Sequence, residues 1–217
     1  MIYLEETLNI TPPLGEVRDN FIKITQDLMI PACERLGARL VSAWYGNYEW
    51  VMQTTHLFEF DDIEALKSFR INSCQDREWG NYLAELEVFA PVRRSRLLEP
   101  IGALPPERLH KAIEDSQKTP LKVYTLAILE VNPDKMNGFI DMIKVLPEAT
   151  PIIASWRPIS GNANQVIDLW KGDIWWKAEN MAYQPSAGDQ EWAKQLRVLA
   201  TQERILPIYS LPYSPLL

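Results

Sequence analysis

The sequence predicts an α+β protein made of two tandem units, each with the element order β-α-β-β-α-β. One observation behind this prediction is the spacing of apolar residues, which alternates in some stretches and recurs every three or four residues in others. The other is an internal repeat, and a repeat of this length corresponds to one supersecondary unit. Three markers recur at offsets of 112 or 113 residues: Trp44 as Trp156, Leu57 as Leu169, and Trp79 as Trp192.

The first unit is predicted to span residues 1–98. Alternating apolar and polar residues indicate strands at 2–8 and 52–60, and further strands are predicted at 39–45, an apolar run that ends in an aromatic pair, and at 92–98. Apolar residues spaced by three and four indicate helices between these strands, at 14–28, 63–69 and 79–90. Pro31 is expected to kink or restart the first helix, and Gly37 is expected to end it.

Residues 99–120 are predicted to form a linker with a short helix, and residues 121–217 the second unit. In the second unit Tyr124 takes the place of Tyr3. The chain runs 41 residues from Tyr3 to Trp44 but only 32 from Tyr124 to Trp156. The first helix of the second unit should therefore be about two turns shorter.

Composition limits the partners that this chain can have. Hydrophobic residues make up 47% and charged residues 24%, which is typical of a globular protein, and no apolar run is long enough to span a bilayer. A net charge of -7 argues against nucleic acid and anionic membranes, which attract clustered Lys and Arg. The N-terminal residues have no signal-like pattern, so a cytoplasmic location is expected. Cys33 and Cys74 have neither metal-ligand nor disulfide-framework spacing, so no metal site is predicted.

The first unit resembles the NIPSNAP family of dimeric α+β barrel proteins. The resemblance is carried by Met1-Ile2-Tyr3, by Ile30 to Trp44 with its Gly-x-x-Leu-Val-x-x-Trp pattern, and by Gln53 to Phe58 with its Gln-x-x-His-Leu pattern. It implies two ferredoxin-like units that pack sheet to sheet as an intrachain α+β barrel, a monomeric pseudo-dimer or a homodimer of it. Two positions depart from the family: Glu6 stands where Arg is frequent, and Asp168 replaces His in the second unit.

His56 and Glu5 are the candidate catalytic residues. His56 lies inside a predicted strand, where its imidazole could act as a general base toward a ligand or could be a buried structural group. Glu5 shares a strand face with Tyr3, and His56 is expected on the same face. If that face lines the barrel, burial would raise the pKa of Glu5 to a useful value; alternatively, Glu5 forms an ion pair with Arg93, Arg94 or Arg96.

Aromatic and charged residues near the predicted hairpins and strands are candidate ligand contacts. Aromatic rings suit a flat apolar ligand, and an arginine fork suits a carboxylate or phenolate. Trp175 and Trp176 are further aromatic candidates. The candidate substrate-binding residues are Tyr3, Tyr48, Trp50, Phe58, Arg96, Tyr124, Asp168 and Trp170.

The resemblance implies two alternative functions. The leading one is a cofactor-independent enzyme, of cyclase, isomerase, lyase or monooxygenase type, that moves a proton on a hydrophobic aromatic or polyketide-like molecule in the barrel. The alternative is a non-catalytic, NIPSNAP-like module that binds a small molecule or a protein. No cofactor is predicted, because the sequence has no Gly-rich phosphate loop and no Cys/His cluster. Haem would require an axial histidine, and His56 is the candidate for that role.

Overall fold

The computed structural model describes residues 1–12, 14–146, 150–172 and 187–217. These residues fall into two compact units. Unit 1 consists of Met1–Leu98 and Tyr209–Leu217, and unit 2 of Glu99–Ile208. The C-terminal segment therefore belongs to the first unit, whereas the sequence assigns it to the second. Trp175 and Trp176 lie outside the described residues.

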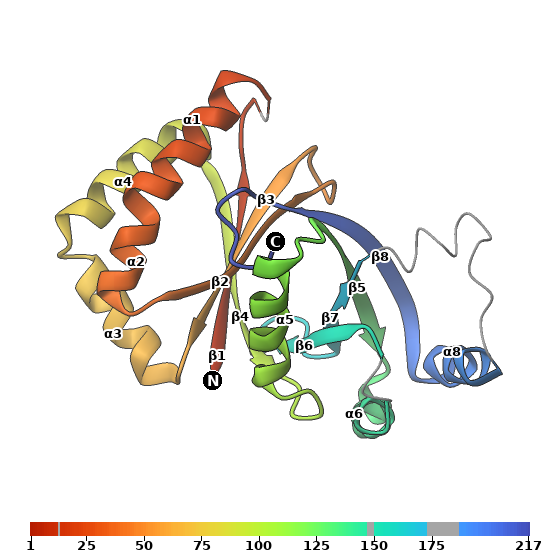
Figure 1. The fold of residues 1–217 in the computed structure, drawn as a ribbon. Helices are drawn as coiled ribbons and strands as arrows, with labels where there is room; N and C mark the ends of the chain where they lie inside the picture. The colour runs from red at the N-terminus through yellow and green to blue at the C-terminus, as the bar shows by residue number, and fades with distance from the viewer. Residues whose placement is uncertain (13, 147–149, 173–186) are drawn as a thin grey trace. The chain divides into compact units, whose positions relative to one another are not determined.

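Unit 1 contains four strands with helices between them (Figure 1). The strands are β1 (Ile2–Asn9), β2 (Arg39–Gly46), β3 (Gln53–Phe60) and β4 (Val92–Pro100). The helices are α1 (Glu16–Ile24), α2 (Ile30–Leu36), α3 (Ile63–Ser73) and α4 (Arg77–Phe89).

A π-helical turn, Thr25–Met29, joins α1 to α2. Pro31 sits in the first turn of α2, directly after the π-helical turn, so the predicted interruption of the helix at Pro31 is confirmed. Gly37 ends α2 with φ 78°, a left-handed conformation that glycine adopts without strain. Asp62 and Asp76 cap α3 and α4 by accepting backbone N–H groups.

The antiparallel register of unit 1 assigns each strand residue to one of two sheet faces. Leu4 pairs with Phe58, and both belong to the apolar core beneath the helices. Glu5 pairs with Leu57 on β3 and with Arg96 on β4, so these residues share the opposite face. Figure 1 shows α1 to α4 covering the first of these faces. We call it the helix-facing side of the sheet.

The C-terminal segment of unit 1, residues 211–217, is bound to the backbone of β2. The N–H of Leu211 donates to the carbonyl of Ala43 at 2.9 Å, and the N–H of Ala43 donates to Oγ of Ser214 at 2.9 Å. The Ser214 hydroxyl in turn donates to the carbonyl of Leu216 at 2.7 Å. Ser214 thus pairs a buried backbone group of β2 and holds the segment in place.

The Ser214→Ala variant should lose about 1–3 kcal/mol of unfolding free energy, because the buried N–H of Ala43 is left without its acceptor. Urea unfolding measures this loss. Ser73→Ala is the matched control, since the Ser73 hydroxyl bonds only an exposed helix carbonyl and its removal should change stability little. Equal stability of the two variants would contradict the anchoring role of Ser214.

Unit 2 has a shorter set of helices, as the residue spacing predicts. Its α6 (Met136–Lys144) replaces the longer helical stretch that runs from α1 to α2 in unit 1. Among the described residues of this unit, the other helices are α5 (Pro106–Lys118), α8 (Ala187–Leu199) and a short 3-10 helix, Pro133–Lys135. The strands are β5 (Val123–Val131), β6 (Ile152–Pro158), β7 (Gln165–Lys171) and β8 (Ala200–Ser210).

The described strands follow one hydrogen-bonded order that closes on itself, β1-β3-β2-β8-β5-β7-β6-β4. The chain is therefore an α+β protein with a closed barrel, and the predicted fold class is confirmed. Each unit has its own apolar core, around Phe21 and Leu86 in unit 1 and around Phe139 and Ile143 in unit 2. None of the described helices is long and apolar enough to cross a bilayer.

Candidate functional site

His56 lies in the middle of β3, on the helix-facing side of unit 1. Its register partners are Glu6 on β1 and Ala43 on β2. The side chain is fully buried, with the ring stacked on Phe21 at 6.1 Å between centroids and edge-on to Phe58 at 5.9 Å. The expectation that His56 shares a face with Tyr3 and Glu5 is wrong, because adjacent β1 residues point to opposite sides and His56 pairs with Glu6.

Tyr213, from the C-terminal segment of unit 1, is the hydrogen-bond partner of His56. The phenol oxygen lies 2.7 Å from Nε2 of His56, and the two rings meet nearly edge to face. Burial raises the pKa of the Tyr213 phenol, and the hydroxyl of Thr25, on the π-helical turn, opposes that rise. Short π-helical turns recur at functional sites in proteins.

Burial lowers the pKa of His56 to about 3, so the imidazole is neutral near pH 7. Its Nδ1 lies 4.0 Å from Oε2 of Glu6 and makes no hydrogen bond within the described part of the chain. Burial raises the pKa of Glu6, although the charge of Arg93 opposes the shift. Glu6, His56 and Tyr213 therefore form a row of groups whose burial favours their neutral states.

Two further groups complete this polar region beneath the helices. The buried hydroxyl of Tyr82 has no hydrogen-bond partner among the described residues, and the pKa of its phenol is raised by burial and by the charge of Glu6. Burial and the charges of Glu6 and Glu34 raise the pKa of Cys33 to about 12, so its thiol is unreactive. Buried polar atoms left without partners are rare in native proteins, and they call for an explanation.

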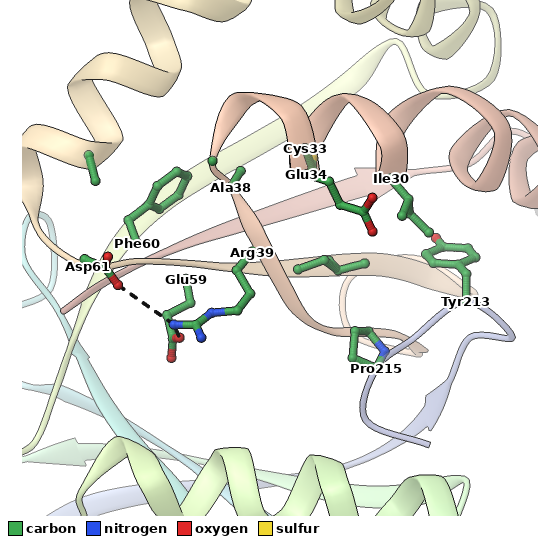
Figure 2. A pocket seen from close by; sticks show the side chains of 13 residues that line it. Ile30, Cys33, Glu34, Ala38, Arg39, Glu59, Phe60, Asp61, Tyr213 and Pro215 are labelled. Atoms are coloured by element: carbon green, nitrogen blue, oxygen red, sulfur yellow. Dashed lines mark ion pairs between the residues drawn. The ribbon is translucent and has the colours of Figure 1, made fainter.

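A pocket of about 520 Å³ in unit 1 opens next to this region (Figure 2). Tyr213 lines it, together with Ile30 and Cys33 of α2 and Pro215 of the C-terminal segment. Its opposite end carries Arg39, Glu59 and Asp61. The remaining lining residues are Glu34, Gly37, Ala38, Leu40, Phe60 and Ala65. His56 is not a lining residue, so a ligand in this pocket would meet Tyr213 first.

The other predicted residues of unit 1 lie on the opposite face of the sheet or in its turns. Glu5 forms an ion pair with Arg96, which is one of the two roles that the sequence left open. The hydroxyl of Tyr3 donates to Glu59 at 2.6 Å, and Nε1 of Trp44 donates to the hydroxyl of Tyr48 at 2.7 Å.

Two further candidates, Trp50 and Phe58, lie in different surroundings. Trp50 is 62% exposed in the β2–β3 turn, whereas Phe58 is part of the helix-facing core. Neither contacts the pocket of unit 1.

The predicted residues of unit 2 form no common site. Asp168 pairs in register with Ser155, whose hydroxyl donates to Oδ1 of Asp168 at 2.5 Å. Burial raises the pKa of Asp168 to about 7, with a smaller contribution from the charge of Glu203. Trp170 is buried in the apolar core of unit 2, edge-on to a tryptophan of α8. Tyr124 lines a separate shallow hollow beside α5, and burial raises its pKa to about 12.

Tyr213, Thr25 and Tyr82 are the site residues that the sequence did not reveal. Tyr213 lies in an irregular, proline-containing segment that the sequence assigns to the second unit. The apolar Leu4 and Leu8 did carry a signal, because they mark the even-numbered face of β1 as the core face. That signal places Glu6, rather than Glu5, beneath the helices.

No family model and no curated protein matches the chain. Among solved structures, a proposed monooxygenase from Lactobacillus acidophilus NCFM superposes with a TM-score of 0.61 at 14% identity, over 95% of this chain and 92% of that one. An anthrone oxidase-like protein superposes with a TM-score of 0.55 at 10% identity, over 99% of this chain and 93% of that one. A NIPSNAP domain protein from Burkholderia xenovorans matches 48% of this chain and 99% of that one, with a TM-score of 0.43 at 20% identity. At these low identities, the likeness to the proposed monooxygenase and to the anthrone oxidase-like protein is one of fold.

Proposed function

We propose that the chain is an enzyme that moves a proton on a largely apolar small molecule bound in the pocket of unit 1, using only side chains. One observation carries the proposal. Tyr213 lines the pocket, and its hydroxyl lies 2.7 Å from a buried neutral histidine that has a carboxyl group behind it. A row of groups of this kind can pass a proton to or from a ligand.

The proposed row works as follows. His56 donates its Nε2 proton toward the oxygen of Tyr213, which frees the phenolic O–H to donate to an oxygen of the ligand. As the ligand oxygen takes the proton of Tyr213, Tyr213 takes that of His56, and Nδ1 of His56 receives one from Glu6. The 4.0 Å between Nδ1 and Glu6 must shorten for the last transfer, and catalytic hydrogen bonds are often long in the ligand-free state.

The size and lining of the pocket suit an aromatic ketone or a polyketide-like molecule. Ile30, Ala38 and Phe60 supply apolar surface, and Tyr213 supplies the group that would meet a carbonyl oxygen. Protonation of a carbonyl oxygen makes the neighbouring C–H acidic enough for a water molecule to take its proton, which leaves the enol, a step common to isomerisation, cyclisation and oxidation of such molecules. The names of the structural neighbours, a proposed monooxygenase and an anthrone oxidase-like protein, agree with this reaction class.

Anthrone, incubated with the protein in D₂O, provides the test. Wild type should accelerate both the exchange of the anthrone methylene protons and the appearance of anthraquinone in air. Tyr213→Phe should slow both by roughly 10²–10⁴-fold, because it removes the proton that the ligand receives. Proton NMR follows the first reaction and absorbance the second.

Tyr209→Phe is the matched control, since Tyr209 stacks on Tyr45 and does not line the pocket. It should leave both rates unchanged. Equal rates for wild type and Tyr213→Phe would overturn the catalytic role. The full burial of His56 would then favour the alternative, a binding module in which the Tyr213–His56 pair is structural.

A further inference from the structure

The charges around the pocket of unit 1 are unbalanced. Its lining residues include three carboxylates, on Glu34, Glu59 and Asp61, and one guanidinium, on Arg39. Figure 2 shows Arg39, Glu59 and Asp61 together at one end and Glu34 near Ile30 and Tyr213 at the other. A cavity lined mainly by one sign of charge attracts ligands of the opposite sign and repels those of the same sign.

Arg39 is already engaged by two of these carboxylates. It forms an ion pair with Glu59, whose side chain is completely buried, and lies 3.9 Å from Asp61. Glu59 also accepts the hydroxyl of Tyr3 at 2.6 Å, so its position is fixed from the other face of the sheet. An incoming anion would have to compete with these carboxylates for the single guanidinium.

No neighbouring cation of the described chain balances the negative charge of Glu34. It forms no ion pair with any described residue, and its charge reaches into the pocket, since it contributes to the raised pKa of the neighbouring thiol of Cys33. Its carboxylate lies on the same side of the pocket as Tyr213 (Figure 2). The end of the pocket where the reaction is proposed therefore carries an uncompensated negative charge.

We infer that the ligand of this pocket is neutral or cationic, and that a cationic or hydrogen-bond-donating group on it lies beside Glu34. This inference rests on the proposed function, because it concerns the molecule whose oxygen meets Tyr213. The carboxylates that line the pocket repel carboxylate and phosphate ligands. Their negative charge therefore discriminates against anionic substrates. The effect weakens with salt, because Glu34 and Asp61 are exposed.

Three probes that share one naphthalene ring test the inference: 2-naphthylmethylamine, 2-naphthylmethanol and 2-naphthoate. Dissociation constants are measured by fluorescence titration at low and high salt. The amine and the alcohol should bind wild type at least roughly tenfold more tightly than the carboxylate at low salt, and the gap should narrow at high salt. Glu34→Gln should reduce the ratio between the dissociation constants of the carboxylate and the amine severalfold. Glu85→Gln, an exposed carboxylate of α4 outside the pocket, should leave it unchanged.

The Ala65→Trp variant separates the two ways in which the inference can fail, because Ala65 lines the pocket and a tryptophan there would fill it. Suppose that wild type binds the carboxylate as tightly as the amine and that Ala65→Trp binds neither. The charge preference would then be overturned, but the pocket would still be a ligand site. If no probe binds wild type, or if Ala65→Trp binds all three unchanged, the pocket is not a ligand site. That result would overturn the proposed function as well.

Discussion

The Asp168→Asn variant should be more stable than wild type at pH 8, by on the order of 4 kcal/mol, and nearly equal to it at pH 4. Burial raises the pKa of Asp168 to about 7, from an ordinary value of 3.8. Between these values the folded state keeps a proton that the unfolded state releases, so stability falls as pH rises from about 4 to 7. Asparagine does not titrate, and its carbonyl can still accept the hydroxyl of Ser155.

Urea unfolding of both proteins at several pH values between 4 and 8 measures this difference. Asp141→Asn is the control, because Asp141 is an exposed residue of α6 paired with Lys144 at the surface. It should show no comparable gain at pH 8. Parallel pH profiles for wild type and Asp168→Asn would mean that Asp168 is ionised in the folded protein at neutral pH.

The His56→Gln variant should show the opposite change on the acid side. The pKa of His56 is lowered to about 3, from an ordinary 6.5, because burial of the charged ring carries a large desolvation penalty. Below pH 6.5 the unfolded state takes up a proton that the folded state refuses, so wild type loses stability as pH falls. Glutamine takes up no proton, and the variant should lose about 3 kcal/mol less between pH 7 and pH 4.

The same unfolding series measures this effect, with His110→Gln as control, since His110 is the other histidine of the chain and lies partly exposed on α5. The control should reproduce the wild-type acid slope more closely than His56→Gln does. An unchanged slope in His56→Gln would show that the ring titrates alike in the folded and unfolded states and is not held neutral by burial, which would remove the basis of the proposed proton row.

The helices and strands could be predicted from the sequence because their signals are local. Period-two alternation marked β1. Pro31 marked the restart of α2 and Gly37 marked its end, both through the conformational limits of the residue itself. The π-helical turn before α2 had no such marker. Its residues, Thr25–Met29, read as a continuous helix.

The candidate site could be predicted only in part, because it depends on register and on distant contacts. His56 could be singled out by its residue type. For Glu5 the sequence allowed two roles, and an ion pair with an arginine of β4 was one of them. Which face of β3 carries His56 depends on its alignment with β1, and a shift of one residue reverses the face. The partner of His56, Tyr213, is 157 residues away in the sequence, and no local pattern links two such positions.

The attachment of the C-terminal segment also determines when the site can form during synthesis. A ribosome releases residues 1–98 long before residue 213, so the nascent first unit lacks the phenol that pairs with His56. Until Ser214 arrives, the N–H of Ala43 on β2 has no partner from this segment. Unit 1 therefore begins to emerge before unit 2 but is completed only after it, and a fragment of residues 1–98 lacks Tyr213 and Pro215, two of the residues that line the pocket.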